Sequence, residues 1–319
     1  MALFGTEEAI PACVNWPKVF ADAGINGVSA ICYEAVKRLP EDRQPDFDLM
    51  LRWDLSAQEI REGFHHRHEV TQKLRSLLEG KGFSMLLLKG ETLADYYPQP
   101  DLRESGDVDF IALPDPAGCI DFISSLGITV VPQRTHTSFV YEGIHFESHP
   151  LELEEAGYEV DRKTFKMLKE AQPDNVVRED GCLELAPVMQ AVFTVKHISQ
   201  HANYMGGRVS VRMLLDLALL LRRHGEILNE WEPELRQTGL YRFSRILLCT
   251  IDRLFGTRFR NGRNLCRRLE AKCFSYIFLT DSKGFFRSVI KFAFLPLRTS
   301  EFTRVLYEKA GRTLTRRTE

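Results

Sequence analysis

The sequence lacks the features that would place the protein in a membrane, in a secretory pathway or around a thiolate metal site. Its seven cysteines are an odd number without a C-x-x-C pair, which argues against a disulfide framework or a thiolate zinc site. Apolar stretches such as Met213–Leu221 are far shorter than the roughly 18 residues that a spanning helix needs. Glu7 and Glu8 stand where a signal peptide would carry basic residues. We therefore expect a cytoplasmic protein with no membrane span.

The chain also has little net charge. Its 319 residues carry a formal charge of −2, so no global field attracts nucleic acid or membrane. Hydrophobic residues make up 44% of the sequence and charged residues 27%, which excludes disorder over most of its length. This length and composition predict a globular protein with a sizeable core, built as two domains or as one with helical additions.

Charge is unevenly distributed along the chain. Residues 258–319 hold 15 Lys and Arg against 5 Asp and Glu, whereas the preceding residues hold 27 against 39. Aromatic residues such as Phe285, Phe286, Phe292 and Phe294 are interleaved with this basic tail. The tail is either a polyanion-binding surface or a set of amphipathic helices whose basic side pairs with the acidic body, and we favour the second interpretation.

Changes in hydrophobic periodicity divide the chain into three parts. Apolar residues recur at helical spacing up to residue 79, with Pro40 and Pro45 separating at least two helices. Residues 80–160 alternate like strands, and residues 161–319 are again helical. We therefore predict an α+β fold, with a small mixed sheet in the central part and helical segments on both sides.

The central part contains a strand, a short helix, a second strand, a longer helix, a third strand and a hairpin. The hairpin turns at Glu142-Gly143. The expected elements, in chain order, are Met85–Leu88, Thr92–Tyr97, Asp107–Leu113, Asp115–Leu126, Ile128–Val131, Ser138–Tyr141 and Ile144–Ser148.

The candidate chemistry lies at the start of the second strand. In Gly106-Asp107-Val108-Asp109, side chains alternate between faces, so Asp107 and Asp109 point the same way while Val108 points into the core. Two carboxylates about 7 Å apart on one strand face repel each other unless a cation lies beside them. Hard oxygen ligands of this kind suit Mg²⁺ or Mn²⁺ bound to phosphate oxygens.

Two further segments fit this interpretation. Lys89-Gly90 ends the first strand, where a glycine allows a phosphate to approach the backbone closely. In the hairpin, Glu147 shares a strand face with His145 and His149. If that strand neighbours Asp107–Leu113, Glu147 completes a cage of three carboxylates.

These segments resemble an uncharacterised family of the polymerase-β-like nucleotidyltransferase superfamily. Leu88-Lys89-Gly90 is similar to the family's L-K-G strand end, and Arg103-Glu104-Ser105-Gly106-Asp107-Val108-Asp109 to its R-x-x-G-D-[IV]-D motif. A later strand ends in a carboxylate and a histidine, here Glu147 and His149. The resemblance continues into the helical half, with histidines followed by an aspartate in an apolar helix: His197, His201 and Asp216.

The resemblance implies a metal-dependent nucleotidyltransferase that moves a nucleoside monophosphate from a nucleoside triphosphate to a hydroxyl. Asp107 and Asp109 would hold Mg²⁺ or Mn²⁺, with Glu147 as third ligand or proton acceptor. The nucleotide-binding residues would be Lys89, Gly90, Arg103 and Gly106, with Lys89 and Arg103 as phosphate contacts. The acceptor is left open among RNA, a glycan precursor, a small molecule and a protein. The alternative is a catalytically inactive, antitoxin-like protein that binds a nucleotide or a partner.

The histidines and the aspartate of the helical half allow a structural or a functional interpretation. Asp216 lies in a helix that is apolar on nearly all sides, so we expect it to be buried and paired, with Arg212 or a histidine as its partner. In the functional interpretation, His201 faces the cleft and contacts substrate. The earlier group of His65, His66 and His68 is interpreted as exposed helix surface.

Overall fold

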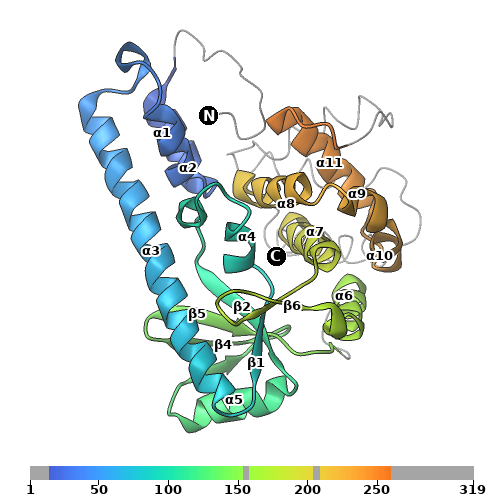
Figure 1. The fold of residues 1–319 in the computed structure, drawn as a ribbon. Helices are drawn as coiled ribbons and strands as arrows, with labels where there is room; N and C mark the ends of the chain where they lie inside the picture. The colour runs from blue at the N-terminus through green and yellow to red at the C-terminus, as the bar shows by residue number, and fades with distance from the viewer. Residues whose placement is uncertain (1–13, 154–157, 204–208, 260–319) are drawn as a thin grey trace, which may run out of the picture.

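The computed structural model describes residues 14–153, 158–203 and 209–259 (Figure 1). Within these residues the fold is α+β, with a mixed seven-stranded sheet between N-terminal and C-terminal helices. The predicted fold class is therefore confirmed. The basic tail lies outside the described residues from position 260 onward, and so do its aromatic residues.

The N-terminal helices begin at side-chain caps. Asn15 accepts a hydrogen bond from the Lys18 amide at the start of α1, and Asp46 accepts one from the Leu49 amide at the start of α3. Between these helices the two prolines flank a short 3₁₀ turn, as their positions predicted. The bounds are Trp16–Ile25 for α1, Ser29–Val36 for α2, Glu41–Arg43 for the 3₁₀ turn and Phe47–Glu79 for α3.

The sheet has the strand order β3-β4-β5-β2-β1-β7-β6. Strand β2 pairs with β5 in parallel, β1 pairs with β7 in parallel, and all other neighbours are antiparallel. The bounds are Ser84–Leu87 for β1, Asp107–Leu113 for β2, Val130–Pro132 for β3, Thr137–Tyr141 for β4, Ile144–Ser148 for β5, Val176–Val177 for β6 and Leu183–Glu184 for β7.

The predicted strands and hairpin are present, and the sheet extends further than the sequence pattern indicated. The hairpin turns at Glu142 and Gly143, both with positive φ, as its two-residue loop requires. The short helix α4 (Glu91–Ala94) is one turn rather than the two expected, and the 3₁₀ turn Pro100–Leu102 follows it. Strands β6 and β7 come after residue 160, so the predicted helical segment supplies two strands to the sheet.

Helices cover both faces of the sheet. Leu74 and Leu78 of α3 pack with Val108 and Phe110 on one face, together with Ile123 of α5 (Pro116–Ser125). Figure 1 shows α3 as the long helix beside the sheet. On the other face, Ile111 packs with residues of α6 (Glu159–Glu170) and α7 (Pro187–Asn203). Because Asp109 alternates with Val108 and Phe110, it faces the side of α6 and α7.

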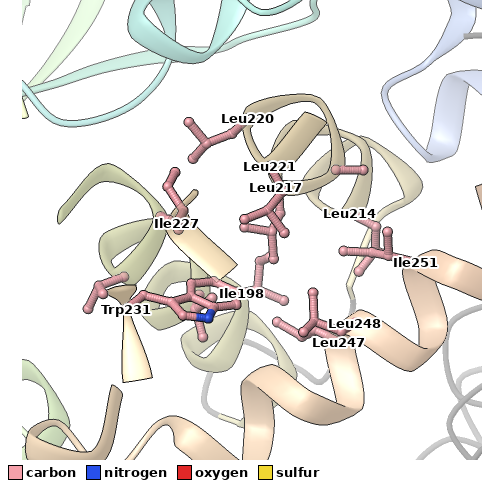
Figure 2. Packing of buried hydrophobic residues seen from close by; sticks show 14 of the residues in the cluster. Ile198, Leu214, Leu217, Leu220, Leu221, Ile227, Trp231, Leu247, Leu248 and Ile251 are labelled. Carbon is pink, nitrogen blue, oxygen red and sulfur yellow. The ribbon is translucent and has the colours of Figure 1, made fainter. Parts of the chain in front are cut away.

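The remaining helices form a second core against α7 (Figure 2). Its central residues include Ile198, Leu217 and Trp231. No helix in the described ranges is long and apolar enough to span a bilayer. The bounds are Val211–Arg223 for α8, Ile227–Glu230 for α9, Glu232–Gln237 for α10 and Tyr241–Phe255 for α11, and the 3₁₀ turn Gln172–Asp174 follows α6.

Candidate active site

Three carboxylates meet where β2 and β5 lie side by side. The parallel register places Asp109 opposite Glu147, and Asp107 stands two residues earlier on the same face of β2. One carboxylate oxygen from each of Asp107, Asp109 and Glu147 lies within 4.8 Å of the other two. The structure therefore brings together the three acids that the sequence singled out.

Asp109 is the most buried of the three acids and has two partners. Its side chain is 2% exposed, with the Lys89 ammonium 2.9 Å from Oδ2 and the His149 Nε2 atom 3.0 Å from Oδ1. Burial alone would raise the pKa of Asp109, but the charges of Lys89 and His149 outweigh it and hold that pKa well below its usual range. Each oxygen of Asp109 thus has one charged or polar side chain beside it.

Glu147 has the opposite electrostatic character. Burial, followed by the charges of Asp109 and Asp107, raises the pKa of Glu147 to about 7. Asp107 is the most exposed member of the group, with its Oδ2 atom 3.7 Å from the Lys89 ammonium. A carboxyl group whose pKa lies near neutral pH can both bind a cation and accept a proton.

The two glycines assigned to nucleotide binding differ. Gly90 has φ of +79°, and a Cβ atom there would lie 3.5 Å from the Asp107 carbonyl oxygen. Gly90 therefore lets the chain turn directly after Lys89 while staying close to β2. Gly106 is exposed, and a Cβ atom built there would have no neighbour within 4 Å. Its contact with nucleotide stays a prediction.

Arg103 lines the cleft but is paired within the protein, and its contact with phosphate stays a prediction. Its side chain is 3% exposed, and its Nε and Nη2 atoms donate to the two oxygens of Asp216 at 2.8 and 2.9 Å. The Tyr97 hydroxyl donates to Asp216 as well, at 2.8 Å. Asp216 is thus buried and paired as expected, but its partner is Arg103 rather than Arg212 or a histidine. A buried carboxylate needs a charged partner, and this pair engages two of the three guanidinium nitrogens of Arg103 at the wall of the cleft.

A cleft lies beside the carboxylates, between the sheet and helices α7 and α8. Lys89, Gly90 and Asp107 line it on the sheet side, and His197 and Arg212 on the helical side. The His201 ring centre lies 4.6 Å from that of His197 but does not line the cleft. Burial, followed by the positive charge of Lys89, lowers the pKa of His197 well below 6.5 and that of His201 to about 4. Both rings are therefore neutral at pH 7.

The sequence analysis missed His136. This residue precedes β4 and lies with Glu147 and His149 in a second possible metal-binding group, its ring centre 5.3 Å from that of His149. Burial, followed by the charge of His149, lowers its pKa to about 4. The hairpin register carries the signal, because Thr137 pairs with Ser148 and the next pair outward is His136 and His149.

His68 was predicted to be exposed helix surface, but the structure places it partly buried beside a carboxylate. Its Nδ1 atom lies 3.1 Å from the buried Glu91 carboxylate, and both residues are grouped with Asp180. Three chain segments meet there, from α3, α4 and the turn between β6 and β7, so the contact ties the N-terminal helix to the sheet.

The carboxylate group fits a hard divalent cation. Its donors are all oxygens, which suit Mg²⁺ or Mn²⁺. Burial and the charges of Asp109 and Asp107 raise the pKa of Glu147, and a bound cation would offset this repulsion among the three acids. Asp107, Asp109 and Glu147 are therefore the residues that would hold such an ion.

The site thus combines a mixed sheet that carries acids on neighbouring strands, a K-G turn and a helical wall. The chain belongs to the family described as uncharacterised nucleotidyltransferase, whose model matches residues 12–256. This membership supports a role in nucleotidyl transfer and implies a nucleoside triphosphate as substrate. No curated protein and no solved structure matches the chain.

Proposed function

We propose that the protein transfers a nucleoside monophosphate from a nucleoside triphosphate to a hydroxyl group, with Mg²⁺ or Mn²⁺ as its cofactor. The observation that carries this proposal is the register of β2 and β5, which gathers Asp107, Asp109 and Glu147. Family membership supports the same reaction. A bound divalent ion would neutralise the triphosphate oxygens and acidify the attacking hydroxyl.

The protein's own residues suit the other parts of the reaction. Glu147 accepts the proton of the acceptor hydroxyl, because its carboxylate lies beside Asp107 and Asp109. The hydroxyl oxygen forms a bond to the α-phosphorus while the bond to the pyrophosphate oxygen breaks, without a covalent enzyme intermediate. Lys89 lines the cleft and supplies positive charge next to the phosphates.

The acceptor is expected to enter between the sheet and helices α7 and α8. A small sheet alone leaves its catalytic face open, and these helices provide the second wall of the cleft. RNA, a phosphorylated glycan precursor, a small molecule and a protein side chain remain the candidate acceptors. If RNA binds, its affinity falls steeply with rising salt concentration, which a filter-binding series measures.

Label transfer tests the proposed reaction. The full-length protein is incubated with each labelled nucleoside triphosphate and Mg²⁺, with and without cell extract. We expect pyrophosphate release and a labelled product, both reduced to background by Asp107→Asn combined with Asp109→Asn. The matched control is Asp121→Asn, which removes an exposed carboxylate on α5.

Two outcomes contradict parts of the proposal. Transfer that survives the double substitution shows that the metal ligands lie elsewhere. A wild-type protein that binds nucleotide with Mg²⁺ but never releases pyrophosphate is the inactive binding protein of the alternative hypothesis.

A further inference from the structure

Arg212 differs from the two other cations that line the cleft. Lys89 is ion-paired with Asp109, and Arg103 is paired with Asp216. Among the described residues, no carboxylate lies within ion-pair distance of the Arg212 guanidinium. Its Nη1 atom donates to a neutral acceptor instead, the Glu104 carbonyl oxygen, at 2.8 Å. Asp216 and Asp107 attract Arg212 from further away, but no described carboxylate forms an ion pair with it.

This unpaired charge has an energetic cost. Arg212 is partly buried, and burial followed by the nearby Arg103 guanidinium lowers its pKa. A guanidinium removed from water without a partner destabilises the folded protein. If the side chain at this position only filled space, an uncharged residue would make the folded protein more stable.

The protein nevertheless holds Arg212 in a defined position. Its backbone amide donates to the Asn26 carbonyl oxygen at 3.2 Å. Its side chain is held by the hydrogen bond to the Glu104 carbonyl oxygen. Gly27 lies against the side chain, where a Cβ atom would come within 3.1 Å of the Arg212 Nε atom. The α1–α2 connection thus leaves room for the guanidinium and orients it.

We propose that Arg212 binds the phosphate groups of the triphosphate, as an arginine fork that, unlike Arg103, is not ion-paired with a described carboxylate. The inference rests on the proposed function and deepens it by assigning a polyphosphate-binding residue. A guanidinium presents paired N–H donors that match phosphate oxygens, and a polyanion supplies the ion-pair partner that Arg212 lacks among the described residues. Lys89 and Arg212 then contact the polyphosphate from opposite walls, the sheet and α8.

Binding of inorganic tripolyphosphate tests this assignment without any transfer reaction. Isothermal titration calorimetry in Mg²⁺ compares the full-length protein with R212M, R212K and the control R223M, which removes an exposed arginine from the same helix. We expect R212M to weaken binding about 10–100-fold, as for a lost charge-assisted hydrogen-bond pair. R212K keeps the charge without the fork and should weaken binding several-fold, whereas R223M should bind like the wild type.

Thermal unfolding of the same variants separates binding from support of the fold. R212M should melt at or above the wild-type temperature, because it removes an unpaired charge. R212M that melts lower and binds normally would make Arg212 a structural residue, and R212K with wild-type affinity would exclude the fork. A wild-type protein without affinity for tripolyphosphate would also overturn the assignment. Because the probe contains no nucleoside, absence of nucleotidyl transfer alone leaves this inference standing.

Discussion

Two groups of charged side chains near the cleft differ in how well their charges are balanced. In the first group, which we call the buried triad, Arg103 and Tyr97 satisfy both oxygens of Asp216. In the second, the carboxylate group of Asp107, Asp109 and Glu147, the acids outnumber the single ammonium of Lys89.

The difference separates charges that are balanced within the protein from charges that are not. The buried triad joins the segment before β2 to α8 and needs nothing from outside. The carboxylate group keeps a raised pKa on Glu147, which a bound cation would lower. Removal of a charge should therefore lower the free energy of unfolding in the buried triad and raise it in the carboxylate group.

The largest effect is expected in the buried triad. Asp216→Asn leaves Arg103 buried without a counter-charge, so the free energy of unfolding should fall by about 3–5 kcal/mol. Urea denaturation measures this change. The control is Lys166→Gln, which breaks an exposed pair with Glu170 and should change stability by less than about 0.5 kcal/mol. An Asp216→Asn protein as stable as the wild type would remove the distinction between the two groups.

A smaller effect of opposite sign is expected in the carboxylate group. Without metal, Glu147→Gln relieves repulsion from Asp109 and Asp107, so stability should rise by about 1 kcal/mol. The gain that Mg²⁺ gives the wild type should shrink in this variant, because a ligand is lost. Urea denaturation in EDTA and in Mg²⁺ measures both changes, with exposed Glu179→Gln as the control. A loss of stability in EDTA would show that Glu147 supports the fold.

The smallest effect concerns His68 and Glu91, a pair in which the carboxylate is buried and the histidine is partly exposed. The hydrogen bond to Glu91 raises the pKa of His68 above 6.5, with a smaller contribution from Asp180. The protonated form is therefore favoured in the folded state. This contribution is complete below pH 6.5 and is lost as the pH rises through the raised pKa. His68 is 40% exposed, so solvent screening limits the contribution to about 0.5 kcal/mol.

Comparison of variants across pH isolates this contribution. His68→Gln should be less stable than the wild type at pH 6 and equally stable at pH 9, whereas exposed His66→Gln should show no such trend. A constant difference between His68→Gln and the wild type would mean that protonation of this pair does not contribute.

The sequence predicted the strands that carry a local signal, which are the apolar run Met85–Leu88 and the alternating segment Asp107–Leu113. Met85–Leu88 and Asp107–Leu113 alternate between the two apolar faces of the sheet, and the Glu142-Gly143 turn fixes the hairpin register. Strands β6 and β7 have two residues each, which is too short for any periodicity. Their place in the sheet depends on pairing with β1, a strand almost one hundred residues earlier.

The site was predicted where its chemistry is local and missed where it depends on distant partners. Asp107 and Asp109 share one strand face by alternation alone, and Glu147 needed only the adjacent hairpin. The role of Arg103 depends on Asp216, which is 113 positions further along the chain. A motif position shows that an arginine is present, but it does not show which carboxylate the fold brings to it.

The parallel pairing of β1 with β7 has a consequence for the order in which the protein is made. All three acids have been synthesised once β5 has emerged from the ribosome. At that stage β7, with Leu183 and Glu184, has not yet been made, so one edge of β1 is unpaired. The ion pair of Arg103 forms later still, because Asp216 must first leave the exit tunnel. A nascent chain can thus bring its three candidate metal ligands together before helices α7 and α8, which form the other wall of the cleft, have been synthesised.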